Sequence, residues 1–257
     1  MEKMILITGC SSGIGLTAAI GLKQRGYHVL ATCRHQHDIE TLQQQGFDVI
    51  QLDLDDKASV ENAAQHILSL SKGQLYAIFN NAGFGVYGSL QTISREKLEQ
   101  QFSTNFFGLH QLTMLLLPEL LANNQGRIIQ TSSIMGFIST PGRGAYAASK
   151  YAVEAWSDAL RLELYQTGIK VSLIEPGPIS TRFTNNVNQT QQDKPVQNKG
   201  IAKRFTLTPE DILPKLYHAL ENPRPKIRYR VTFVTHVTAI LKRVLPDCIM
   251  DRILKNN

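Results

Sequence analysis

The stretch Thr8-Gly9-Cys10-Ser11-Ser12-Gly13-Ile14-Gly15 joins the apolar run Met4-Ile5-Leu6-Ile7 to the periodic segment from Leu16 to Lys23. The apolar run predicts a buried strand, and the segment after the turn predicts a helix. Glycines at such a junction allow a tight turn, let backbone N–H groups approach a pyrophosphate, and let the helix pack close to the strand. The spacing is T-G-x-x-x-G-x-G, not G-x-G-x-x-G. In its strand–turn–helix context it predicts a dinucleotide site at the start of the helix.

Strands and helices alternate along the following sequence. Further strands are predicted at His28 to Thr32, Val49 to Leu52, Leu75 to Phe79, Arg127 to Thr131 and Lys170 to Ile174. Helices are predicted at Ile39 to Gln45, Asp56 to Leu70, Ser94 toward Leu121 with Pro118 near its end, and Ala145 to Tyr165. This order predicts an α/β fold, a doubly wound, Rossmann-like parallel sheet with helices on both faces. Ligands of such sheets bind beyond the carboxyl ends of the strands.

Tyr146 and Lys150 form a potential acid–base pair in Gly144-Ala145-Tyr146-Ala147-Ala148-Ser149-Lys150. Residues i and i+4 of a helix share one face. A free phenol has a pKa near about 10, and an ammonium beside it favours the phenolate and makes it a better catalyst. The alternative is a surface tyrosine next to a surface lysine. The glycine-rich turn upstream favours the catalytic interpretation.

Bulk properties agree with one enzyme domain over residues 1–257. A length of 257 residues and 42% hydrophobic content are enough for a sizeable core. We expect residues 1–125 to bind mainly the cofactor, 126–221 to contain the catalytic and substrate-lid region, and 222–257 to form a C-terminal extension.

Cysteine usage and hydropathy indicate a cytoplasmic protein. The cysteines Cys10, Cys33 and Cys248 are widely spaced and odd in number, which suggests a reducing compartment, packing roles for the first two, and no metal site. The sequence shows no signal peptide and no apolar run near the ~18 residues of a membrane span. We therefore expect no stable membrane insertion.

Basic residues concentrate near the C-terminus. From Lys194 onward there are 13 Lys and Arg against 5 Asp and Glu. Such a segment could meet acidic lipid, nucleic acid or another polyanion. The alternative is a solvated rim around a site for an anionic cofactor. We favour the rim, with no nucleic-acid partner, because no nucleic-acid-binding motif accompanies the charge.

Taken together, the motifs resemble the short-chain dehydrogenase/reductase family of single-domain type. The resemblance covers residues 3 to about 221 and follows the family's order: the glycine turn, Asn80-Asn81-Ala82-Gly83, Asn105, Ser133, the Tyr146/Lys150 pair and Pro176-Gly177. The glycine turn and Ala31-Thr32-Cys33-Arg34 are most similar to the retinoid and 17β-hydroxysteroid branch. The whole chain looks closest to bacterial NADPH-dependent aldehyde reductases of that branch.

The resemblance implies four catalytic residues. Ser133 would polarise the substrate carbonyl, with Ser132 as the near rival. Tyr146 would act as the acid or base, and Lys150 would lower its pKa and bind the nicotinamide ribose. Asn105 would hold a proton-relay water, although an asparagine inside a helix could also bend that helix locally.

The end of the second predicted strand favours NADP(H) over NAD(H). A carboxylate there would bind the adenosine ribose and repel a 2′-phosphate, but the sequence is Thr32-Cys33-Arg34, with no acid until Asp38. Arg34 offers a planar cation that can bind phosphate, and Ser11 and Ser12 add hydroxyl donors. The alternative is a solvent-facing arginine. Many NADP-binding relatives place a basic residue where this chain has Ser12.

Other cofactor contacts are implied by position within the family pattern. Asp53 and Leu54 would contact the adenine, although Asp53 could instead cap a helix. Ile179 and Thr181 would hold the nicotinamide carboxamide. The expected cofactor-binding residues are Gly9, Ser11, Ser12, Gly13, Ile14, Gly15, Arg34, Asp53, Leu54, Asn80, Ala82, Gly83, Tyr146, Lys150, Pro176, Gly177, Ile179 and Thr181.

Apolar residues after two strands predict an apolar substrate pocket or ordinary core packing. They are Phe84, Val86, Tyr87, Ile134, Met135, Phe137 and Ile138. The polar segment from Arg182 to Thr206 is typical of a substrate lid. The mildly amphipathic stretch from Val231 to Leu245 could cover the pocket, pack on a neighbouring subunit or touch a membrane surface, in that order of preference.

The predicted activity is hydride transfer between NADP(H) and a small carbonyl or alcohol substrate, with reduction of apolar aldehydes or ketones favoured. Steroid or retinol dehydrogenase activity is the alternative with the same mechanism. A nucleotide-sugar epimerase would need a larger C-terminal domain, and a non-catalytic NADPH-binding regulator would not need the retained Ser133, Tyr146 and Lys150. Apolar positions on the two long helices predict a homodimer or homotetramer.

Overall fold

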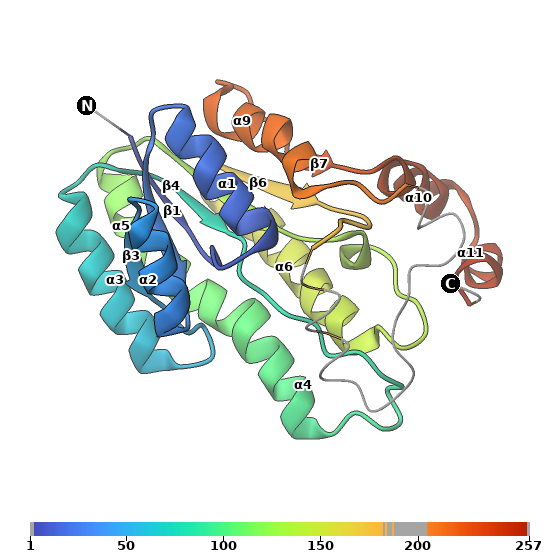
Figure 1. Cartoon of the computed structure of the whole chain (residues 1–257). Coiled ribbons are helices and arrows are strands. Elements are labelled where there is room, and N and C mark those ends of the chain that lie inside the picture. Colours follow the sequence, from blue (N-terminus) through green and yellow to red (C-terminus); the bar gives the residue numbers. More distant parts are fainter. Residues whose placement is uncertain (1–2, 182, 184–186, 188–204, 256–257) are drawn as a thin grey trace.

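The computed structural model describes residues 3–181, 183, 187 and 205–255, and these form a doubly wound α/β fold (Figure 1). Seven strands in this part of the chain make one sheet in the order β3-β2-β1-β4-β5-β6-β7, and every neighbouring pair is parallel. The strands are β1 Met4–Ile7, β2 His28–Cys33, β3 Asp48–Gln51, β4 Leu75–Asn80, β5 Gly126–Thr131, β6 Ile169–Glu175 and β7 Arg228–Arg230. The predicted fold class is confirmed.

Helices cover both faces of the sheet, as Figure 1 shows. One hydrophobic core joins the sheet to α1, α2 and α9, and a second joins its other face to α3, α5 and α6. The helices are α1 Gly13–Gln24, α2 Gln36–Gln44, α3 Lys57–Ser71, α4 Arg95–Phe102, α5 Gly108–Ala122, α6 Gly144–Glu163, α9 Leu213–Glu221, α10 Phe233–Val244 and α11 Asp247–Leu254.

The position of β1 in the middle of the sheet explains why its sequence is a continuous apolar run. Side chains of a strand alternate between the two faces of a sheet. Ile5 and Ile7 lie in one core, whereas Met4 and Leu6 lie in the other. A central parallel strand that is covered on both faces needs apolar residues at every position.

The helix predicted from Ser94 toward Leu121 is confirmed as one uninterrupted helical stretch from Arg95 to Ala122, and its middle section is π-helical. Ser94 does cap its start, because its hydroxyl accepts a hydrogen bond from the backbone N–H of Lys97. A π-helical turn at Ser103–Phe107 then separates α4 from α5. Pro118 lies inside α5 and does not end it.

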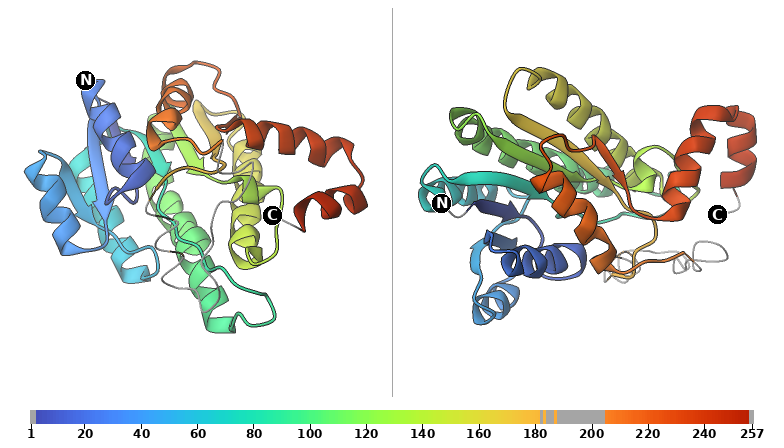
Figure 2. Two further views of the ribbon diagram at one scale, coloured as in Figure 1. Left: turned by 45° about the vertical axis from the view of Figure 1, so that its right-hand side comes forward. Right: turned by 90° about the horizontal axis from the view of Figure 1, so that it is seen from above.

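The elements after β6 were not predicted individually. Strand β7 is only three residues long, and it pairs with β6 through Leu173, Ile174 and Glu175. Figure 2 shows α10 and α11, drawn in red, at the end of the molecule opposite the N-terminus. Among the described helices, none is both long enough and apolar enough to span a membrane.

Candidate active site

The glycine-rich turn lies where the chain order of the sheet reverses. β1 pairs with β2 on one side and with β4 on the other, so the carboxyl ends of β1 and β4 open a crevice. The hydroxyl of Thr8 accepts hydrogen bonds from the backbone N–H groups of Asn81 and Ala82, each at 3.0 Å. The Asn81 amide donates to the carbonyl oxygens of Thr8 at 3.0 Å and Gly9 at 3.3 Å. These bonds join the turn to the end of β4.

Two glycines in the turn are required by geometry. Gly9 has φ +74°, in the region that side chains disfavour, and a Cβ there would lie 2.8 Å from the Cα of Ala82. A Cβ on Gly15 would overlap the carbonyl oxygen of Gly9, since the two atoms would be 2.1 Å apart. Helix α1 therefore starts in direct contact with the turn. Its first turn contains no acidic side chain, and the Ser12 hydroxyl makes no capping bond there, which suits a phosphate ligand.

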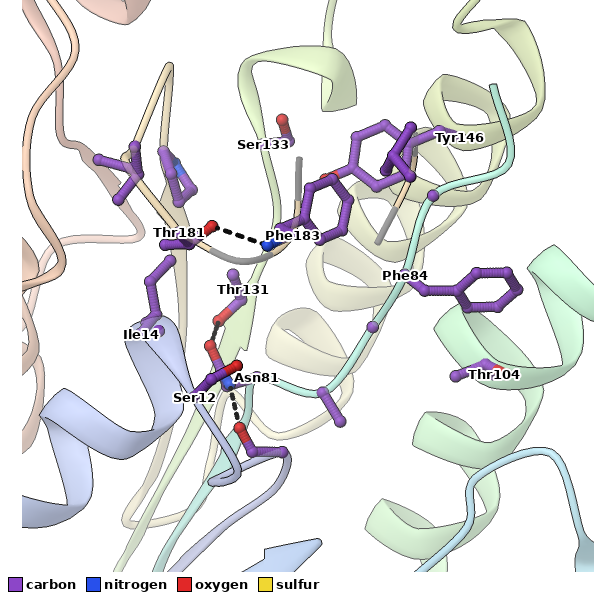
Figure 3. A pocket seen from close by; sticks show the side chains of 18 of the residues that line it. Ser12, Ile14, Asn81, Phe84, Thr104, Thr131, Ser133, Tyr146, Thr181 and Phe183 are labelled. Carbon is purple, nitrogen blue, oxygen red and sulfur yellow. Dashed lines mark hydrogen bonds between the residues drawn. The ribbon is translucent and has the colours of Figure 1, made fainter. Parts of the chain in front are cut away.

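A cavity of about 770 Å³ runs from this turn to Tyr146 and Lys150 on α6. Most of the predicted site residues line it. They are Gly9, Ser11, Ser12, Gly13, Ile14, Arg34, Asp53, Leu54, Ala82, Gly83, Ser133, Tyr146, Lys150, Pro176, Gly177, Ile179 and Thr181. Figure 3 shows Ser12 and Ile14 at one end, Ser133 and Tyr146 at the other, and Asn81 and Thr131 between them.

Three predicted site residues do not line the cavity. Gly15 is packed beneath the turn. The amide of Asn80 points into the protein, where it is buried and donates to the hydroxyl of Thr113 at 2.9 Å. Its neighbour Asn81 lines the cavity, and Asn80 does not. Asn105 is buried behind the wall.

Tyr146 and Ser133 meet at the inner end of the cavity (Figure 3). The Ser133 hydroxyl accepts a hydrogen bond from the backbone N–H of Met135 at 3.1 Å, which fixes its position. Burial raises the pKa of Tyr146 well above its ordinary value, and Tyr87 adds to the rise. The hydrogen bond with Ser133 and the charge of Arg143 oppose it.

Lys150 lies one helical turn after Tyr146 on α6. Its ammonium donates to the carbonyl oxygen of Thr131 at 2.7 Å and is 5.8 Å from the centre of the Tyr146 ring. Burial lowers the pKa of Lys150 to about 8, and the negative charge of Glu154 opposes that shift. The sequence predicted a lowered pKa for Tyr146. In the chain itself that prediction is wrong, because burial of the phenol outweighs the nearby positive charge.

The π-helical turn positions Asn105. Its side-chain oxygen accepts from the backbone N–H of Phe84 at 3.0 Å, and its amide donates to the Phe84 carbonyl at 2.9 Å and to Ser149 at 3.1 Å. A Cβ placed on Gly83 would be 3.1 Å from the Asn105 oxygen and 3.8 Å from the Lys150 ammonium. Both polar groups therefore converge on Gly83. The expected local distortion of the helix at Asn105 is present, and π turns occur often at functional sites.

The other end of the cavity is polar and charged. Arg34 follows β2, is exposed, and donates from Nε to the His35 ring at 3.2 Å. Asp38 and Asp53 line the same end. Asp53 does not cap α3, because that role belongs to Asp56, whose carboxylate accepts from the backbone N–H of the helix's second residue.

Only some of the apolar residues predicted to line a substrate pocket do line the cavity. Phe84, Tyr87, Ile134 and Met135 line it together with Phe183, whose ring centre is 5.5 Å from that of Tyr146. Val86, Phe137 and Ile138 do not line it. The expected lid from Arg182 to Thr206 falls mostly outside the described residues.

Helices α10 and α11 support this apolar wall from behind. Leu241, Leu245 and Met250 pack in one cluster with Met135 and Tyr146. The three roles expected for the C-terminal segment stay predictions, because these helices pack against the pocket wall and do not line the cavity itself.

A buried charge cluster lies directly behind the catalytic end. Glu175, which is 1% exposed, forms ion pairs of 3.2 Å with Arg228 and with Arg230. Arg228 also pairs with Glu154 at 3.0 Å and Asp158 at 2.7 Å. Burial and the charge of Glu154 raise the pKa of Glu175 to about 7, against the effect of the two arginines. The cluster ties β7 to the end of β6 and to α6.

Several lining residues were missed at the sequence level. They include Thr32, His35, Asp38, Asn81, Gly85, Gln100, Thr104, Thr131 and Arg143. Asn81 and Thr131 follow or end central strands, so the rule that ligands bind at the carboxyl ends could have found them. Gln100 and Thr104 belong to α4 and the π turn, and no local signal marks them.

The fold, the glycine turn and the Tyr146/Lys150 pair are accompanied by similarity to one family of oxidoreductases. Residues 3–192 match the family model described as short chain dehydrogenase, and the chain belongs to that family. The Escherichia coli K12 protein named "Uncharacterized oxidoreductase YbbO" is 62% identical over 255 residues, which cover 99% of this chain and 95% of that protein.

Two further similarities concern better-defined proteins. Human retinol dehydrogenase 8 is 39% identical over 191 residues, 70% of this chain and 60% of that protein. This similarity is consistent with the predicted resemblance of the chain to the retinoid branch of the family. A solved structure titled as the closed form of serine dehydrogenase complexed with NADP+ superposes with a TM-score of 0.77 at 27% identity, over 90% of this chain and 95% of that one.

Proposed function

We propose that the chain is an NADP(H)-dependent oxidoreductase that reduces apolar aldehydes or ketones. The main support is the continuous cavity that has the glycine turn and Arg34 at one end and Ser133 and Tyr146 at the other. A dinucleotide whose phosphates lie at the start of α1 would extend toward the phenol along this cavity.

The side chains at the catalytic end suit carbonyl reduction. A bound nicotinamide supplies the hydride. Ser133 would donate a hydrogen bond to the carbonyl oxygen and polarise it. Tyr146 would give its proton to the developing alkoxide, since a phenol holds that proton at neutral pH. Lys150 would bind the nicotinamide ribose, and Asn105 would hold the water that returns the proton.

NADP(H) is proposed over NAD(H) because Arg34 is the exposed cation that follows β2 in the cavity. A guanidinium binds a phosphate through two parallel hydrogen bonds. The serine dehydrogenase structure with NADP+ supports an NADP site in this fold. The negative charge of the nearby Asp38 would weaken binding of a 2′-phosphate. The proposed preference for NADP(H) therefore depends on Arg34.

The apolar wall supports an apolar substrate. Phe84, Tyr87, Met135 and Phe183 surround the space in front of Tyr146. The similarity to retinol dehydrogenase 8 supports a second candidate, oxidation or reduction of a retinoid or steroid by the same residues. Both candidates require the same pocket and differ in substrate size.

A homodimer or homotetramer is proposed from the two long helices. The apolar residues Leu115 and Leu121 of α5, and Leu162 and Tyr165 at the end of α6, are exposed at 39%, 41%, 63% and 80%. Apolar side chains that cluster on helix surfaces are typical of subunit contacts.

The direct test follows NADPH absorbance with a panel of aliphatic, aromatic, retinoid and steroid carbonyls. Turnover of apolar members by the unmutated protein, lost in Tyr146→Phe, is the expected result. NADPH binding without oxidation of any member would support the non-catalytic regulator instead.

A further inference from the structure

Arg143 places a guanidinium in the catalytic end of the cavity, where the proposed reaction does not use it. It directly precedes α6, three residues before Tyr146, and it is half-buried in the cavity wall. Its Cζ lies 5.6 Å from the centre of the Tyr87 ring. The rings of Tyr87 and Tyr146 are themselves 5.7 Å apart. Tyr87 therefore lies beside both the guanidinium and the ring at which a substrate would react, and the charge of Arg143 acts on that phenol.

Arg143 forms no ion pair with any residue that the structure describes. Other arginines of comparable exposure do: Arg161 pairs with Asp158, and Arg228 pairs with three carboxylates. A cation that has lost part of its water is costly when no anion compensates it. The contact with the Tyr87 ring compensates part of that cost.

The charges along the cavity are segregated. Its acidic lining residues, Asp38 and Asp53, lie at the end near Arg34. Among the residues that the structure describes, the charged ones that line the catalytic end are Arg143 and Lys150, and the Lys150 ammonium is already bonded to a backbone carbonyl. Arg143 is therefore the cation that remains available to a substrate.

We propose that Arg143 binds an acidic group of the substrate, so that the chain prefers carbonyl compounds with a carboxylate a few bonds from the reacting carbonyl. This proposal rests on the proposed function and names the substrate class of the same site. An arginine binds a carboxylate through two parallel hydrogen bonds. The apolar wall around Tyr146 would hold the hydrocarbon between the two polar groups, so the substrate is an apolar oxo acid.

The test compares two aldehydes of nearly equal shape, 4-carboxybenzaldehyde and 4-formylbenzamide, and repeats the comparison with succinic semialdehyde and butanal. For each pair, kcat/KM with NADPH is measured for the unmutated protein, Arg143→Gln and Arg143→Lys. Arg95→Gln is the matched control, because Arg95 is an exposed arginine on α4 that pairs with Glu99 and does not line the cavity. Binding of the two benzaldehydes to the NADP+-loaded protein is measured by calorimetry, which needs no turnover.

We expect the unmutated protein to prefer the acid, and the preference to weaken as salt is raised. Arg143→Gln should lower kcat/KM for the acid about 10- to 100-fold and for the amide less than threefold, and Arg143→Lys should recover part of the loss. Equal losses for acid and amide, or no loss, would overturn the proposal. If no carbonyl is turned over, the proposed function fails, and acid-selective binding that Arg143→Gln removes would still support the anion site.

Discussion

The ammonium of Lys150 donates a 2.7 Å hydrogen bond to the carbonyl oxygen of Thr131, the last residue of β5. The lysine on α6 is thus anchored to the end of a central strand and lies beside the ring of Tyr146, not on its hydroxyl. Any charge effect of Lys150 on the phenol would therefore act through space.

Replacement of Lys150 by Met should raise the pH at which alcohol oxidation begins. The oxidation direction needs the phenolate, and loss of a positive charge near the ring disfavours it. We expect the apparent pKa of alcohol oxidation to rise by about one unit or more, with turnover at pH 8 reduced about 100-fold. A pH profile of kcat/KM for NADP+-dependent oxidation checks this. An unchanged midpoint would show that Lys150 does not act on the phenol.

Tyr146→Phe should remove turnover without removing cofactor binding. The substitution deletes only the hydroxyl, so packing against Tyr87 and Phe183 persists. We expect kcat to fall by about 10²- to 10⁴-fold, while the Kd for NADPH, measured by fluorescence, stays within threefold. Activity within tenfold of the unmutated protein would refute the assignment of Tyr146 as the acid.

Arg34→Gln should weaken NADPH selectively. Loss of the charge-assisted contacts to a 2′-phosphate should raise the KM for NADPH at least tenfold and leave that for NADH nearly unchanged. Cys33→Asp, which puts a carboxylate at the end of β2, should shift preference further toward NADH. Steady-state kinetics with both coenzymes provide the measurement, and NADH is the internal control. Equal changes for NADPH and NADH would contradict a phosphate contact.

Asn105→Ala should destabilise the fold as well as reduce activity. The change leaves the backbone N–H of Phe84 without its side-chain partner, whereas the Phe84 carbonyl oxygen still accepts from the Gln101 amide. It also removes the bond from the Asn105 amide to Ser149. Buried polar groups without partners cost about 1–3 kcal/mol each. Urea unfolding should therefore show a clear loss relative to Asn123→Ala, a surface variant that also loses a side-chain bond to a backbone carbonyl. Equal midpoints for the two variants would show that Asn105 is not structural.

Glu175 should make stability depend on pH. Its pKa is about 7 in the folded chain against an ordinary 4.5, so the folded state binds more protons between those values. Stability from this group is complete below pH 4.5 and is lost as pH rises toward 7. The difference in unfolding free energy between the unmutated protein and Glu175→Gln should therefore shrink by at most about 3 kcal/mol over that interval. Denaturant unfolding at several pH values measures it. A difference that does not change with pH, or that grows, would contradict the raised pKa.

Local sequence accounted for most of the strand and helix positions and for the catalytic end of the site. The apolar run before the glycine turn predicted a strand covered on both faces, because the run is short, has no polar position and is followed at once by the glycine turn. The spacing of Tyr146 and Lys150 placed them on one face of α6 before any tertiary contact was known. The sequence could not decide between Asn80 and its equally polar neighbour Asn81. The folded structure turns the Asn80 side chain toward Thr113 and leaves Asn81 in the cavity wall.

Strand β7 and the π turn could not be read from the sequence. Three residues carry no periodicity, and β7 exists because β6 offers it an unpaired edge and Glu175 offers its arginines a buried carboxylate. The π turn at Asn105 depends on bonds to Phe84 and Ser149, which are 21 and 44 residues away.

The sequence alone determined which chemical groups the chain possesses and which of them share a turn or a helix face, because those relations depend on backbone geometry over a few residues. The tertiary structure alone decided that Lys150 is anchored on Thr131, that burial raises the pKa of Tyr146, and that Arg143 has no described carboxylate partner. These features depend on solvent exclusion and on contacts between distant segments, which arise only when the sheet and its helices are assembled.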